Sequence, residues 1–70
     1  MTRDEWIEAF ARELGVEPPT PEQAEKLLAL AGTAAHSSER TAAPLACYVA
    51  GHAGASIEEI LAAADRVRPD

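Results

Sequence analysis

The sequence lacks most of the features that mark a metal protein, a disulfide-bonded domain, a nucleotide-binding enzyme or a membrane protein. It has one cysteine, Cys47, which cannot form an internal disulfide, and it has no CxxC, HExxH or glycine-rich phosphate-loop pattern. Its apolar segments are all shorter than the roughly 20 residues that span a bilayer. The acidic segment Thr2–Glu5 is not followed by the apolar region of a signal peptide, which favours a cytoplasmic location. We therefore expect no cofactor and no membrane association.

Basic residues are also scarce. Six Lys and Arg residues stand against 12 Asp and Glu residues, which gives a net charge of −6. Binding to nucleic acids depends on Lys and Arg side chains that neutralise phosphates, and so does adhesion to anionic membranes. We therefore expect no nucleic-acid partner. The acidic balance fits a soluble protein or a partner with a basic surface.

The length of 70 residues predicts a single domain that covers residues 1–70. Alanine is abundant and β-branched residues are few, which favours helices over strands. A chain this short buries only about 60% of the surface that its unfolded form exposes. Its small core therefore needs support from helix capping, self-association or a partner.

Three segments begin with a capping box, in which Ser or Thr at the N-cap is followed three residues later by Glu or Gln. Apolar residues recur at helical spacing after each box. The boxes at Thr2–Glu5, Thr20–Gln23 and Ser56–Glu59 thus predict helices over residues 3–14, 21–38 and 57–67. In the first helix, the apolar residues share one face, as is usual for a helix packed in a core: Trp6, Ile7, Phe10 and Leu14.

A fourth helix is predicted from Pro44 to about His52, with Thr41 as a candidate N-cap. The run Leu45–Ala50 carries no charge on any side, and a helix that is apolar all round is normally buried. We therefore expect an all-α fold, a compact bundle of four short helices around this buried third helix. A bundle of this size is not expected to contain a small-molecule pocket of several hundred Å³.

The one concentrated group of polar residues is His36, Glu39 and Arg40, just before the apolar run. His36 could act as a base oriented by Glu39, and Arg40 could hold a phosphate or carboxylate. Alternatively, His36 and Arg40 satisfy the last carbonyls of the preceding helix, and Glu39 pairs with Arg40. The structural alternative is favoured, because polar groups near a core must find partners in any case.

A metal site and a reactive cysteine have weaker support from the sequence. The remaining candidate metal ligands are Cys47 and His52, which are five residues apart and so do not share a helix face. Cys47 has no basic neighbour in sequence that would activate its thiol, and it fits a small core residue. His52 fits a cap at a helix end. We expect no metal site and no enzymatic activity.

The string A-H-x-x-E-R-x-x-A-P-L at residues 35–45, together with Asp4–Trp6 in the first helix, resembles a small bacterial domain of unknown function. The chain is also similar to the segment that follows the nucleotidyltransferase domain in molybdenum-cofactor guanylyltransferase-like proteins. That reaction requires a nucleotide-binding α/β domain with a glycine-rich loop, and this chain has neither. The resemblance therefore implies an accessory or docking module for such an enzyme, by analogy with the fusion.

Two hypotheses follow. In the first, the chain is a non-catalytic interaction or accessory module that binds a protein partner or itself, and it exposes an apolar patch that includes Trp6. In the alternative, it is a small-molecule or anion-binding domain that uses His36, Glu39 and Arg40. An enzyme that acts alone is the least favoured.

Overall fold

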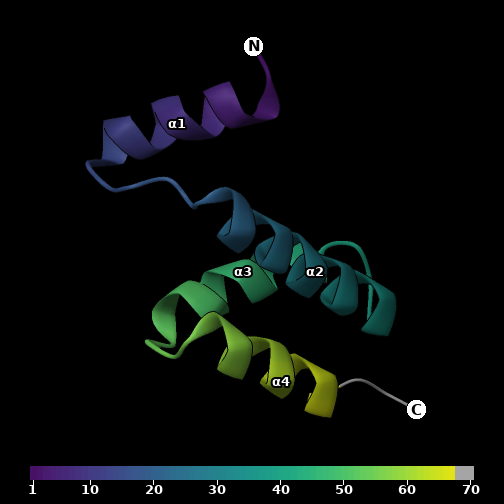
Figure 1. Cartoon of the computed structure of the whole chain (residues 1–70). Helices are drawn as coiled ribbons and strands as arrows, with labels where there is room; N and C mark the ends of the chain where they lie inside the picture. The colour runs from purple at the N-terminus through teal and green to yellow at the C-terminus, as the bar shows by residue number, and fades with distance from the viewer. Residues whose placement is uncertain (68–70) are drawn as a thin grey trace.

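The computed structural model describes residues 1–67, which form an all-α fold (Figure 1). The helices are α1 (Arg3–Leu14), α2 (Pro21–Ser37), α3 (Ala42–His52) and α4 (Ile57–Val67). The predicted fold class is confirmed, and the helix boundaries agree with the predicted ones to within two residues. Residues 68–70 of the predicted domain lie outside the described part. Within residues 1–67, no helix combines the length and the apolar character that crossing a membrane requires.

The predicted capping boxes form and explain where three of the helices begin. The Thr2 hydroxyl accepts a hydrogen bond from the Glu5 N–H at 3.1 Å, and the Glu5 carboxylate accepts one from the Thr2 N–H at 2.7 Å. The same reciprocal pair of bonds begins α2 and α4, at Thr20–Gln23 and Ser56–Glu59. Each box satisfies backbone N–H groups that have no partner within the helix.

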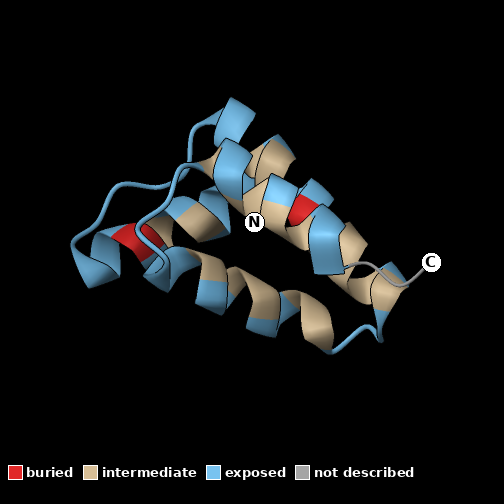
Figure 2. Ribbon diagram, turned by 90° about the horizontal axis from the view of Figure 1, so that it is seen from below, coloured by how far each residue is buried: buried red, intermediate tan, exposed pale blue. Residues whose placement is uncertain are grey.

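The central helix is α2, which packs against both α3 and α4. Its Leu30 side chain is only 4% exposed, and Ala11 in α1 is the other buried residue among residues 1–67 (Figure 2). The prediction that the third helix is buried at the centre is wrong, because α3 contains no buried residue. The side chains of Leu45 and Val49 are largely exposed. A helix that is apolar all round is buried only if it has neighbours on every side, and α3 packs mainly on α2.

The first helix stands apart from the other three. In Figure 1, α2 lies between α1 and α4, and α1 has no helix packing comparable to that of α2 with α3 or α4. The radius of gyration is 12.7 Å, whereas about 11 Å is typical of a compact domain of this length. The connector at residues 16–20 contains Pro18 and Pro19, which favour an extended backbone between α1 and α2.

The predicted core role of the α1 apolar face is wrong for the single chain. Trp6 is 53% exposed, Phe10 is 49% exposed, and Leu14 is also exposed. The amphipathic pattern predicted the helix correctly, and Ile7 on this face is half-buried, but within residues 1–67 the Trp6, Phe10 and Leu14 side chains are not covered. The side chains are left half in solvent, because apolar spacing identifies a face without identifying what covers it.

Candidate functional site

An open apolar groove of about 550 Å³ lies between α2, α3 and α4. Leu30 of α2 contributes to its floor, and the exposed side chains of Leu45, Val49 and Val67 belong to its lining. Every residue that lines it is uncharged. The sequence did not predict this groove, which is open to solvent and so differs from the deep small-molecule pocket that a bundle of this size is not expected to contain.

The groove is wide because small residues line it. Helix α3 contributes Ala46 and Ala50, and helix α4 contributes Ala63 and Ala64. Ala46 and Ala50 are one helical turn apart, and Ala63 and Ala64 each lie about one turn from Ile60, which also lines the groove. The sequence signal was therefore present as alanines at helical spacing. Neither the uniform apolarity of the third helix nor the apolar stripe of the fourth distinguishes a packed face from an open one.

The position of α4 on α2 is reinforced by an ion pair between the Lys26 ammonium and the Glu58 carboxylate. The hydrogen bond from Lys26 lowers the pKa of Glu58 below its ordinary value, and the same bond raises the pKa of Lys26. Both side chains are at least partly exposed, so solvent screens the pair and its stabilising effect is small. Neither residue lines the groove, which keeps the groove itself free of charge.

A second apolar surface lies on α1. The rings of Trp6 and Phe10 stack with their centroids 5.0 Å apart and their planes 30° from parallel. Leu14 lies a further turn along the helix. We call these three residues the α1 ridge. The exposed apolar patch that the interaction hypothesis predicts is thus present, both here and at the groove.

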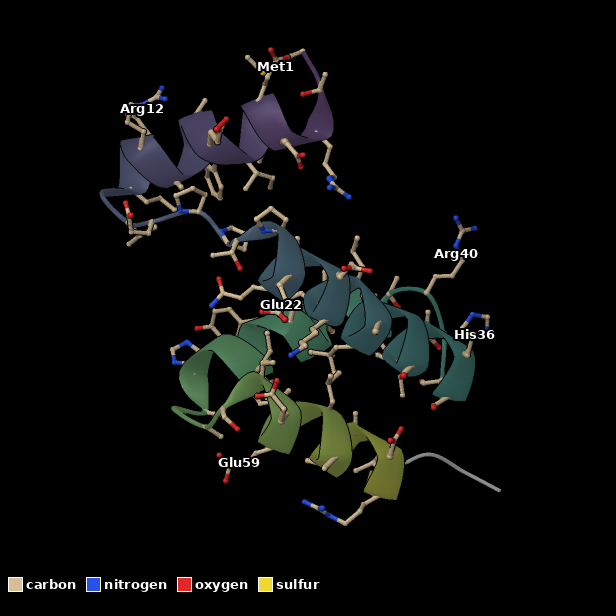
Figure 3. The ribbon with its side chains drawn as sticks, in the orientation of Figure 1. Met1, Arg12, Glu22, His36, Arg40 and Glu59 are labelled. Atoms are coloured by element: carbon tan, nitrogen blue, oxygen red, sulfur yellow. The ribbon has the colours of Figure 1, made fainter. Side chains whose placement is uncertain are left out.

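The predicted polar cluster lies outside the groove. Helix α2 ends at Ser37, so Glu39 does not share a helix face with His36. All three cluster side chains are exposed, and those of His36 and Arg40 extend outward from the end of α2 and its connector (Figure 3). Within residues 1–67, no ion pair joins Glu39 to Arg40. The anion-binding role of His36, Glu39 and Arg40 stays a prediction.

The predicted N-cap residue of the third helix, Thr41, occupies the expected position but makes a different hydrogen bond. Thr41 precedes α3, but its side chain makes no capping bond. Its hydroxyl instead donates to the Glu39 carboxylate at 2.7 Å. The Ala42 N–H donates to the Glu39 carbonyl at 2.9 Å, so a backbone turn leads the chain into α3. Pro44 falls in the first turn of the helix, where its missing N–H has no partner to lose.

The remaining candidates for chemistry do not form a centre. Cys47 is half-buried on α3, and the His52 ring contacts the Tyr48 ring at a centroid distance of 4.4 Å. In the described part of the chain, no group of three His, Cys, Asp or Glu side chains is arranged to hold a metal ion. Within residues 1–67, the groove is therefore the best-supported candidate for a functional site.

Comparison with known proteins identifies the family. The sequence model of a family described as "Domain of unknown function (DUF6457)" matches residues 1–69, and the chain belongs to this family. The predicted resemblance to a small domain of unknown function is confirmed. No curated protein and no solved structure matches the chain.

Proposed function

We propose that this chain, as a member of that family, is a non-catalytic interaction module whose groove receives the apolar face of a protein helix. The observation that carries the proposal is the groove itself, which is open to solvent and lined by uncharged residues. Leaving it uncovered is unfavourable by roughly 25 cal/mol for each Å² of apolar surface. An amphipathic helix laid into an apolar groove is a recurrent way for proteins to recover that free energy.

The lining of the groove favours a protein helix over a small molecule. Small-molecule sites normally enclose most of the ligand and orient it with a few placed polar groups. Here the polar lining residues are hydroxyl side chains at one end of α2, Thr33, Ser37 and Ser38. The rest of the lining is aliphatic, which suits side chains anchored at successive turns of a helix.

The wider setting that we propose is a cytoplasmic protein system for nucleotidyl transfer to the molybdenum cofactor. The support for it is the resemblance of residues 35–45 to the segment that follows the nucleotidyltransferase domain in guanylyltransferase-like proteins. In this setting the chain contributes docking rather than chemistry. Its test is direct binding between the purified chain and such a nucleotidyltransferase, measured by calorimetry.

The groove is tested by replacing exposed lining residues without disturbing the fold. In the variant Leu45→Gln/Val49→Gln, both changes fall on exposed positions of α3 that line the groove. The matched control is Leu28→Gln on α2, because Leu28 is 56% exposed and lies outside the groove lining. In cross-linking experiments, we expect the Leu28→Gln control to keep the protein contacts of the natural chain and the groove variant to lose them. Identical contacts in all three proteins would contradict the proposal.

A further inference from the structure

We infer that the helix in the groove is α1 of a second copy of this chain, and that two chains exchange their α1 helices reciprocally. The inference rests on the proposed function, because it names the partner of the same groove. It is carried by the exposed area of the chain, by two unfilled apolar surfaces, and by their complementary shapes.

The single chain exposes more surface than a folded monomer of its mass. Its accessible surface is 5607 Å² for 7.4 kDa, whereas a monomer of that mass typically exposes about 4,200 Å². The excess is about 1,400 Å² per chain. A specific interface of standard size buries about 800 Å² per partner, and obligate homodimers bury more. The excess is therefore of the size that a stable homodimer removes from solvent.

Two separate apolar surfaces contribute to the exposed area. One is the α1 ridge, in which Trp6 and Phe10 are each about half exposed. The other is the groove, whose lining includes the exposed residues Leu45 and Val49. A different protein helix would cover the groove but leave the ridge in solvent. A second copy covers both surfaces at once, and the reciprocal exchange gives the two-fold symmetry that is commonest among homodimers.

The two surfaces are complementary in side-chain size. The groove is bordered by alanines on α3 and α4, among them Ala46, Ala50 and Ala64. The α1 ridge carries two of the three aromatic side chains of the chain. Close packing between helices requires large side chains on one surface opposite small ones on the other. The chain thus places two of its three aromatic side chains on α1 and its unfilled space between α2, α3 and α4.

The α1 helix of the same chain does not fill its own groove. In Figure 1, α2 separates α1 from α4, and α4 forms one wall of the groove. The connector between α1 and α2 contains consecutive prolines, Pro18 and Pro19, which disfavour folding back. A helix held out on such a connector is positioned to reach a neighbouring molecule.

The first test is the oligomeric state of the full chain, measured by sedimentation equilibrium. We expect a dimer, with Trp6 fluorescence shifting to shorter wavelength as the protein concentration rises. Both Phe10→Gln on the ridge and Val49→Gln in the groove are expected to weaken dimerisation about thirtyfold or more, the effect of a central interface residue. Leu28→Gln, outside both surfaces, is expected to dimerise like the natural chain. If Phe10→Gln loses its helical circular dichroism, Leu14→Gln on the same ridge replaces it.

The second test separates α1 exchange from any other dimer. Chains with Phe10→Gln keep an intact groove, and chains with Val49→Gln keep an intact ridge. Mixed together, they retain one intact ridge–groove pair, so we expect dimers at concentrations where each variant alone is monomeric. If the dimer instead forms by ridge–ridge stacking, Val49→Gln dimerises like the natural chain, which overturns the inference.

The outcomes distinguish this inference from the proposed function on which it rests. A chain that stays monomeric, but binds another protein through Leu45 and Val49, overturns the α1 exchange and leaves the interaction module intact. A monomeric chain whose contacts are unchanged by the groove substitutions overturns both. A dimer that depends on both surfaces and is recovered in the mixture supports both.

Discussion

The helices α1 and α4 are built alike but packed differently. Both are short, both begin with a capping box, and both carry an apolar stripe. The α4 stripe lies on α2, where Ile57 and Ile60 are half-buried, whereas the α1 ridge is exposed. The difference shows that an amphipathic pattern specifies a helix and a face. It does not specify whether the same chain or another molecule covers that face.

The largest expected contrast is between Leu30→Ala in the α2 core and Phe10→Ala on α1. Leu30→Ala should reduce the free energy of unfolding by about 2–5 kcal/mol, which is a large part of the stability of a small domain. This loss should be independent of protein concentration. The loss for Phe10→Ala should grow with concentration, because its partner lies in another chain. Urea unfolding followed by circular dichroism at two concentrations measures both, and a concentration-independent loss for Phe10→Ala would place its partner within the same chain.

The glycines that flank the two helices give the next contrast. Gly15 after α1 and Gly54 before α4 both have positive φ, of 73° and 68°. Alanine at either position should cost roughly 1–2 kcal/mol, because its Cβ disfavours the left-handed conformation. We expect Gly54→Ala to lower the thermal midpoint of the whole α2–α4 unit, and Gly15→Ala to reduce amide protection in α1 alone. An equal drop in midpoint for both variants would mean that α1 unfolds together with the other helices.

Removing one capping box from each helix is expected to have a smaller effect. Ser56→Ala and Thr2→Ala each remove a side-chain acceptor at a helix start, which typically costs about 1 kcal/mol. Because α4 packs on α2, Ser56→Ala should lower the global free energy of unfolding. Thr2→Ala should increase fraying of α1 with little global effect, as seen by residue-resolved hydrogen exchange. The contrast between the helices would disappear if both changes lowered global stability equally.

A smaller effect on stability is expected from pH, because two glutamates at the start of α4 have lowered pKa values. Hydrogen bonds to Lys26 and to Ser56 lower the pKa values of Glu58 and Glu59 in the folded chain. Their contribution is therefore present above the ordinary glutamate pKa and is lost as the pH falls through the folded values. The pKa of Lys26 is raised, so its contribution is present below the ordinary lysine pKa and is lost as the pH rises through the folded value.

Glu58→Gln measures this dependence. The stability of the variant should fall less steeply than that of the natural chain as the pH decreases, as measured by urea midpoints across the acidic range. Glu25→Gln on α2 is the matched control, because Glu25 is exposed and is not part of the ion pair. If the urea midpoint of Glu58→Gln falls with decreasing pH as steeply as that of the natural chain, the ion pair does not form in solution.

The smallest expected effect on stability is that of a substitution outside α1 and α4. Arg40→Ala should change the thermal midpoint very little, because exposed residues without specific contacts typically contribute within about 0.5 kcal/mol. Titration with inorganic phosphate, followed by NMR, tests whether Arg40 contributes to an anion site with His36 and Glu39. Unfolding of the Arg40→Ala variant would assign this residue a structural role instead.

The helix boundaries could be predicted because their signals are local. A capping box joins residues three apart, and the boxes at Thr2, Thr20 and Ser56 all form as the sequence predicts. The candidate site could not be predicted in the same way. Its lining brings together Leu30, Val49 and Ile60, which are far apart in sequence. The prediction instead centred on His36, Glu39 and Arg40, because polar residues stand out in an apolar sequence, whereas alanines do not.

By itself, the sequence determined the all-α class, the positions of the four helices and the acidic charge. Hydrogen bonding at helix starts and apolar spacing act within one or two turns, so these features need no knowledge of the rest of the fold. Only the tertiary structure decided that α2 is central, that α3 is open to solvent and that α1 stands apart. Burial depends on which elements meet and on how fully their side chains fill the space between them. In this chain alanine-rich helices meet without filling that space.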